Sequence, residues 1–318
     1  MSLLATHKST QRLYKNVIEQ SNSIIDKDRA ARTTELIEKL PSYLCTLLAS
    51  NSLELQHLPQ TLESAVVGTD DSRLLLVESK KAKIYWCVSG FPDFIFAKLP
   101  LSGHFQATYK EYQEQYLREA LAELDVLGNQ YAENVLEFSS LLIWLEIDLC
   151  HPPKAPVTSV TLPSFPHCSF ITSRALYHIP PLFVFSRKSA YALCENLYHE
   201  SLHQQMTATL LQEDILTEEY DPKTTSKIYI PWRKTSWEPD RVLHASFVYT
   251  NLIQMRKDKL IQNQMNVKEH DLIANSVRQS KIILKYLIEQ FSNMKDAFSP
   301  TGWQFIKEIK VQAEKVIQ

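Results

Sequence analysis

The stretch from Ser186 to Glu219 contains neither glycine nor proline, and its apolar residues recur at helical spacing. Alanine, leucine, glutamine and glutamate, which favour helices, are frequent in it. We therefore expect a helix over about residues 188–211. Apolar positions flank the polar ones on both sides, so this helix should be buried; they are Ala190, Leu193, Leu197, Leu202, Met206 and Leu210.

Two histidines and a glutamate lie in the middle of this helix, in the order His199-Glu200-Ser201-Leu202-His203. One helical turn separates His199 from His203, so both imidazoles can reach a single divalent ion. Glu200 projects to the side. The alternative is a pair of core histidines that hydrogen-bond to backbone groups or to Glu200, because a buried polar group without a partner is costly. The spacing favours metal binding over this alternative.

A metal site needs a further ligand, and His244 is the best candidate. It is flanked by Leu243, Phe247 and Val248 on a helix expected over 239–260, which must pack inward. Glutamates that could serve instead lie in an acidic run that we expect to be exposed. Histidines of the proline-rich segment also stay open; these alternatives are Glu218, Glu219, His151, His167 and His178.

Arg241 lies one helical turn before His244, so both side chains can face the same pocket. Arginine offers a bidentate fork to a carboxylate, so a guanidinium beside a metal suits a cosubstrate that carries one. Arg233, on the preceding loop, is the second candidate. The alternative for each arginine is a surface ion pair with Glu238 or Asp240, and the residues alone favour that alternative.

The rest of the chain predicts an α+β fold that is predominantly helical. The runs 73–78 and 83–88 flank a turn and predict a β-hairpin. Seven of the fifteen prolines fall between Pro152 and Pro181, where β-favouring runs predict an irregular, partly stranded segment. The metal-binding helix should pack against the helix at 239–260. Other helices are expected over about 33–48, 106–127, 130–149, 269–295 and 301–316, and a short strand over 227–230.

We expect two regions. Residues 1–150 form a mainly helical N-terminal region whose candidate role is peptide binding, and residues 151–318 form the HExxH metal-binding catalytic region. The chain has only five glycines, and neither a glycine-rich phosphate loop nor a dinucleotide fingerprint is present.

Charge and cysteine usage exclude several partners. The net charge is −2 and no long Lys/Arg block occurs, so nucleic acid and anionic membrane are not expected partners. The five cysteines form no CxxC pair, which is typical of reduced thiols in a cytosol. The first ten residues have no apolar signal region. We expect a cytoplasmic protein.

Three blocks together resemble a known family: His199–His203, the run Ile230–Tyr249 with its Trp-Arg loop and Arg-x-x-His helix, and Ser299–Trp303. They resemble the HExxH-type peptide-modification proteins, the 2-oxoglutarate-dependent HExxH peptide β-hydroxylases found with ribosomally made peptide natural products. The likeness covers about residues 183–310.

The resemblance implies Fe(II) rather than zinc, with His199, His203 and His244 as ligands. It implies 2-oxoglutarate as cosubstrate, held by Arg241 or Arg233, and a ribosomally synthesised precursor peptide as partner. In this scheme Glu200 orients a metal ligand.

Two other classes of function stay open. One is a zinc metallopeptidase, in which Glu200 is the general base for a metal-bound water. The other is a non-catalytic binding protein whose HExxH motif is structural. The sequence leaves open the substrate peptide, the modified residue and the oligomeric state.

Overall fold

The computed structural model describes residues 74–318 except 90, 92–95, 97–100, 163–166 and 263–264. The described residues divide into two compact units, one ending at Gln204 and the other running from Gln205 to Gln318. The boundary falls inside helix α7 (Ala190–Gln212), and each unit is described by itself. The helix expected over 33–48 lies outside the described residues.

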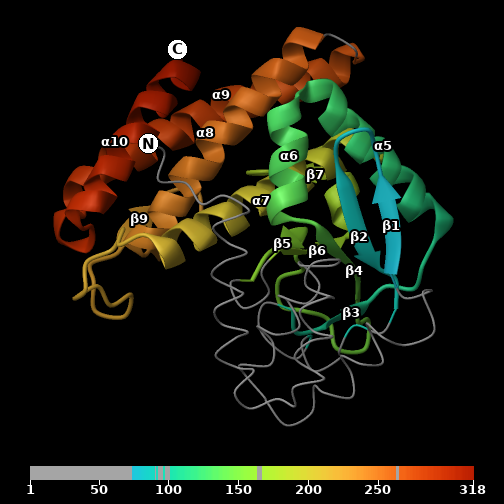
Figure 1. Ribbon diagram of the computed structural model, residues 1–318, viewed down its shortest axis with the longest axis horizontal. Helices are drawn as coiled ribbons and strands as arrows, with labels where there is room; N and C mark the ends of the chain where they lie inside the picture. Colours follow the sequence, from blue (N-terminus) through green and yellow to red (C-terminus); the bar gives the residue numbers. More distant parts are fainter. Residues whose placement is uncertain (1–73, 90, 92–95, 97–100, 163–166, 263–264) are drawn as a thin grey trace, which may run out of the picture. The chain divides into compact units, whose positions relative to one another are not determined.

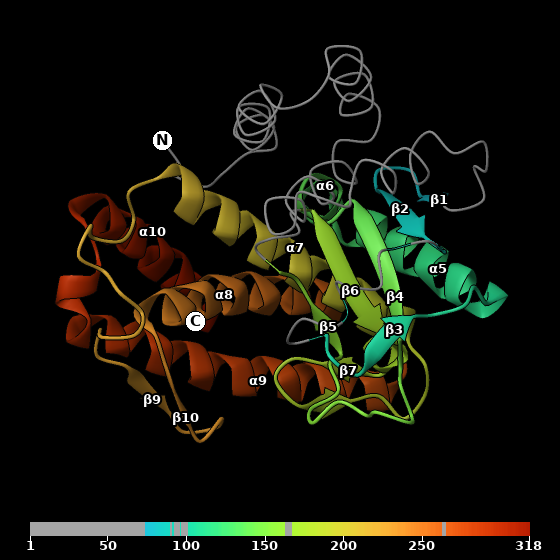
Figure 2. The ribbon, with the colours of Figure 1, turned by 90° about the horizontal axis from the view of Figure 1, so that it is seen from below.

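The unit that ends at Gln204 is built on a mixed sheet with the strand order β1-β2-β4-β6-β5, in which β3 also pairs with β4 (Figures 1 and 2). β2, β4 and β6 are parallel, whereas β1, β3 and β5 run antiparallel to their neighbours. The strands are β1 (Leu74–Glu78), β2 (Lys83–Cys87), β3 (His104–Gln106), β4 (Leu141–Ile147), β5 (Ser159–Val160) and β6 (Cys168–Thr172).

The expected hairpin over 73–88 is confirmed as β1 and β2, which pair antiparallel from Leu74↔Cys87 to Glu78↔Lys83. Helix α5 (Glu111–Leu127) secures its turn. The carboxylate of Asp125 accepts hydrogen bonds from the backbone N–H groups of Lys80 at 2.7 Å and Lys81 at 3.1 Å. A turn whose backbone donors are satisfied in this way is fixed against the helix.

The helix expected over 130–149 is wrong beyond Phe138. After Gly128, α6 covers only Asn129–Phe138, and Leu141–Ile147 is the central strand β4. β4 lies between parallel strands, and its first five residues are buried. A strand covered on both faces carries no apolar–polar alternation, so its sequence pattern cannot be distinguished from that of a buried helix.

The proline-rich segment is packed and partly stranded, as predicted. It supplies β5 and β6, a 3-10 helix at Ser173–Leu176, and a small hairpin of β7 (His178–Ile179) and β8 (Phe183–Val184). All five residues of β6 are buried. This segment leads directly into α7.

The unit from Gln205 is mainly helical. After α7 come a hairpin of β9 (Ile228–Ile230) and β10 (Thr235–Trp237), then α8 (Pro239–Gln262), α9 (Val267–Gln290) and α10 (Pro300–Ile317). α8 runs beside α9, and α10 packs on both (Figures 1 and 2). The helix expected over 269–295 ends earlier, at Gln290. Two 3-10 turns follow it, at 291–293 and 295–297.

The start of α10 docks closely onto the chain that follows α7. The Ser299 hydroxyl caps the helix by accepting from the Gly302 N–H at 3.0 Å, and it also contacts the backbone oxygen of Asp214. A Cβ added at Gly302 would lie 2.1 Å from the backbone oxygen of Ile215. Only glycine fits this contact.

These elements are consistent with the predicted α+β class. The packing of the 188–211 helix against the 239–260 helix stays a prediction, as does the division of the chain at residue 150. Within the part of the chain that the structure describes, each helix is too short or too polar to span a bilayer.

Candidate metal centre

Helix α7 carries the HExxH motif in the unit that ends at Gln204. It covers Ala190–Gln212, within two residues of the predicted limits at each end. The eight residues from Tyr191 to Tyr198 are all buried, and His199 and His203 are partly exposed. The first half of the helix is therefore packed in the interior. The two imidazoles follow directly after this buried half.

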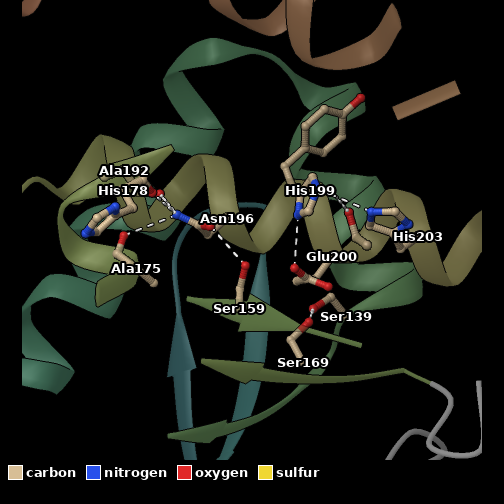
Figure 3. A network of polar contacts seen from close by, with 12 residues as sticks. Ser139, Ser159, Ser169, Ala175, His178, Ala192, Asn196, His199, Glu200 and His203 are labelled. Atoms are coloured by element: carbon tan, nitrogen blue, oxygen red, sulfur yellow. Dashed lines mark hydrogen bonds and ion pairs between the residues drawn. The ribbon is translucent and has the colours of Figure 1, made fainter. Parts of the chain in front are cut away.

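The two imidazoles face each other (Figure 3). The Nε2 atoms of His199 and His203 lie 3.2 Å apart, and the ring centroids are 4.6 Å apart at an interplanar angle of 87°. With metal–nitrogen bonds of about 2.0–2.1 Å, that separation corresponds to an angle of roughly 100° at the ion. This angle lies between octahedral and tetrahedral values, so the pair fits two ligands of one metal ion.

Glu200 lies beneath His199 and is 2% exposed. Its Oε1 atom is 2.9 Å from Nδ1 of His199. In the tautomer whose Nδ1 carries the proton, His199 donates to this carboxylate, and its Nε2 lone pair is directed toward His203. The alternative of hydrogen-bonded core histidines predicts the same carboxylate contact. The Nε2 atoms of the two rings are also at hydrogen-bond distance from each other, as this alternative requires, and the two interpretations differ in whether a metal ion takes the place of that hydrogen bond.

Asn196, one turn before His199, fastens α7 to the segment beneath it (Figure 3). Its Nδ2 lies 2.7 Å from the backbone oxygen of His178, 3.3 Å from that of Ala175 and 2.7 Å from that of Ala192. Its Oδ1 accepts from the Ser159 hydroxyl at 2.9 Å. Sequence reasoning missed this residue, although an asparagine in a buried helix next to a HExxH motif was a usable signal.

Further polar contacts fix the other side of the motif. The Ser201 hydroxyl lies 2.6 Å from Oδ1 of Asn134 on α6, and Gln204 donates to the backbone oxygen of Cys168 at 3.4 Å. Ser139 and Ser169 hydrogen-bond to each other close to Glu200 (Figure 3). The middle of the motif is therefore tied to α6, and the residue that follows the motif is tied to the start of β6.

The third ligand is not brought to this pair in the part of the chain that the structure describes. There, no three His, Cys, Asp or Glu side chains lie close enough together to hold a metal ion. Glu218 and Glu219 are exposed, as expected. His151 is exposed beside Asp148, and the buried His167 contacts the backbone oxygen of Glu137 through Nδ1 at 2.8 Å.

His244 lies on α8, in the unit from Gln205, so its role as a ligand stays a prediction. Burial lowers the pKa of His244 to about 4, and Asp240 opposes this shift. The imidazole is therefore neutral at physiological pH, which is the form that binds a metal. The structure thus brings together His199, Glu200 and His203 of the predicted set.

Arg241 lies near the start of α8, and its guanidinium carbon is 4.6 Å from the centre of the Trp237 ring. The carboxylates expected to pair with it have other partners. Glu238 forms an ion pair with Lys227 at 2.6 Å, and Asp240 accepts from the Tyr220 hydroxyl at 2.6 Å.

Arg233 lies on the β9–β10 loop, close enough to act on Arg241 electrostatically. The pKa of Arg241 is lowered mainly by burial; Glu238 raises it, and the positive charge of Arg233 lowers it further. Two guanidinium groups that repel each other are a favourable place for an anion.

Comparison with protein-family models and with curated protein sequences gives no significant match to this chain.

Proposed function

We propose that this protein is an Fe(II)- and 2-oxoglutarate-dependent peptide hydroxylase that acts on the Cβ of a residue in a ribosomally made peptide in the cytoplasm. The observation that supports it best is the His199–Glu200–His203 arrangement. Two imidazole nitrogens converge at 3.2 Å, and the buried carboxylate orients one ring from behind.

His199, His203 and His244 would hold the iron. Three neutral nitrogen ligands leave positions for a ketoacid and O2, and bound Fe(II) would couple oxidative decarboxylation of 2-oxoglutarate to hydroxylation. Glu200 would hold the proton of His199 on Nδ1, so that Nε2 of the same ring can bind the metal. The N-terminal region up to residue 150 is the proposed place for peptide binding.

Arg241, with Arg233 beside it, would bind the distal carboxylate of 2-oxoglutarate. Since Glu238 and Asp240 are held by Lys227 and Tyr220, the N–H groups of Arg241 can donate to an external carboxylate. The arginine binds and orients the cosubstrate and takes no part in proton transfer, because a guanidinium stays protonated at neutral pH.

The test is anaerobic reconstitution of the full chain with Fe(II), followed by 2-oxoglutarate. A visible metal-to-ligand charge-transfer band from the chelated ketoacid is expected, and Arg241→Ala should raise the concentration of 2-oxoglutarate needed to produce it. Lys234→Ala, on the β9–β10 loop, is the control for loss of a nearby positive charge. An iron-loaded sample without the band would contradict the proposal.

The zinc metallopeptidase is the second candidate, carried by the HExxH spacing itself. It requires Glu200 to act as general base on a metal-bound water. The buried contact between Glu200 and His199 fits an orienting role better. Loss of nearly all peptide hydrolysis in Glu200→Gln, with metal retained, would establish the peptidase. Failure of the purified chain to bind any divalent metal would instead favour a non-catalytic binding protein.

A further inference from the structure

Three aromatic rings and one guanidinium form a continuous column in the unit from Gln205. The rings of Tyr286 and Trp232 have centroids 5.5 Å apart at 86°, and those of Trp232 and Trp237 are 6.2 Å apart at 85°. Arg241 lies over Trp237 at 4.6 Å. The Tyr286 hydroxyl donates to the backbone oxygen of Tyr229 at 2.6 Å, which ties α9 to β9. The column therefore joins α9, the β9–β10 hairpin and the start of α8.

The two indoles contribute their ring faces rather than their N–H groups. Trp237 is 6% exposed. The Nε1 atoms of both Trp232 and Trp237 are buried without a hydrogen-bond partner within the part of the chain that the structure describes. Near-perpendicular packing sets the positive edge of one ring against the negative face of the next, which offsets part of that cost. The two indoles are therefore held by ring–ring contacts rather than by hydrogen bonds of their N–H groups.

Stacking and carboxylate binding use different parts of a guanidinium. An indole attracts the flat face of the group, whereas a carboxylate is bound by the N–H donors along its edge. An arginine whose guanidinium lies over a tryptophan ring can therefore keep N–H donors for a ligand. It has also lost part of the rotational freedom that binding would otherwise remove.

We infer that Trp237 is a positioning residue for Arg241: its indole face fixes the plane of the guanidinium and so increases the affinity of Arg241 for a carboxylate. Trp232 and Tyr286 hold Trp237 in place. The identity of the carboxylate as 2-oxoglutarate rests on the proposed function, whereas the stacking and the anion affinity do not.

The test uses the full chain with two substitutions of Trp237. Trp237→Phe keeps an aromatic face, and Trp237→Leu removes it. The ligand is glutarate, a dicarboxylate without a keto group, titrated calorimetrically into metal-free protein. Trp237→Leu should weaken glutarate binding by roughly 2- to 12-fold, the range expected when one more side chain has to be ordered on binding, and Trp237→Phe by less. Trp303→Leu, on α10, is the control for loss of a tryptophan elsewhere in the unit.

A double-mutant cycle separates positioning from general damage to the fold. If Trp237 acts through Arg241, then Trp237→Leu has no further effect on glutarate binding once Arg241→Gln is present. In the absence of ligand, the side-chain NMR signals of Arg241, assigned by their loss in Arg241→Gln, should be shifted upfield by the ring. This shift should persist in Trp237→Phe and vanish in Trp237→Leu.

Two results would overturn the inference. One is an equal effect of Trp237→Leu with and without Arg241, and the other is failure of the unaltered protein to bind glutarate at millimolar concentration. The proposed function fails separately: Trp237-dependent glutarate binding without a charge-transfer band from iron and 2-oxoglutarate would support the positioning role and contradict the hydroxylase.

Discussion

Nε2 of His199 and Nε2 of His203 lie 3.2 Å apart, one helical turn from each other on α7. Because this distance is set by the helix itself, two of the proposed ligands are preorganised before any long-range contact forms. The buried half of α7 and the Asn196 contacts then hold the pair against the sheet. Removal of either imidazole should therefore abolish metal binding without unfolding the protein.

The first prediction is that His199→Ala and His203→Ala each lose bound metal. A single remaining imidazole on this helix cannot chelate, so the metal content by mass spectrometry should fall from about one ion per chain to nearly none. His151→Ala, at an exposed position in the same unit, should keep its metal. Stoichiometric iron or zinc in either of the first two variants would exclude that histidine as a ligand.

The second prediction concerns Glu200. Glu200→Ala removes the acceptor that holds the proton on Nδ1 of His199, so metal affinity should fall by about 10- to 100-fold. Glu200→Gln keeps an oxygen acceptor and should lose less. Competition with a chelating dye measures both. Equal losses in the two variants would argue that the carboxylate charge, rather than ring orientation, governs affinity.

The third prediction concerns Asn196. Asn196→Leu leaves the backbone oxygens of Ala175 and His178 without this donor in a buried region, which should cost about 1–3 kcal/mol of unfolding free energy. Ser159→Ala removes only the hydroxyl that donates to Asn196 and should cost less. Urea unfolding followed by circular dichroism gives both values. A loss below that of Ser159→Ala would show that water replaces the amide.

The fourth prediction concerns the close contact at Gly302. A Cβ there would lie 2.1 Å from a backbone oxygen, which cannot move like a flexible side chain. Gly302→Ala should therefore lower the unfolding free energy by about 1–3 kcal/mol, although alanine favours helices. Thr301→Ala, in the same turn, should change stability little. Thermal unfolding compares the two, and an unchanged melting temperature for Gly302→Ala would contradict the docking.

The fifth prediction is a pH dependence of stability. Burial lowers the pKa of His104 below the usual 6.5, against backbone hydrogen bonds that raise it. As pH falls below 6.5, the unfolded chain takes up the proton first, so stability decreases until pH reaches the lower folded-state pKa. His104→Leu should show a smaller drop in unfolding free energy between about pH 7.5 and 5.5 than the unaltered chain. His151→Leu is the exposed control, and equal drops in both would exclude His104 as the cause.

Local patterns in the sequence predicted the hairpin and most of the helices that can be compared with the structure. α7 and α8 begin and end within two residues of their predicted limits, because apolar spacing and, for α8, Pro239 at the first position mark them. α10 begins at Pro300, one residue before its predicted start, and Ser299 caps it. β4 was mistaken for helix, since burial on both faces removes the alternation that identifies a strand.

Contacts between distant residues could not be predicted in this way. Neither the Trp237–Arg241 stack nor the link between Asn196 and His178 follows from spacing, because each depends on how loops return to a helix. The sequence favoured surface ion pairs for Arg241, but Lys227 and Tyr220 occupy the two carboxylates concerned. Which charged side chains keep hydrogen-bond donors for a ligand therefore depends on partners that come from other segments.

The contact between Glu200 and His199 also determines how the proposed metal position should respond to salt. Glu200 is 2% exposed and contacts His199 at Nδ1, so dissolved ions screen the attraction between its carboxylate and a metal at Nε2 only weakly. Metal affinity should therefore change little between low and high ionic strength.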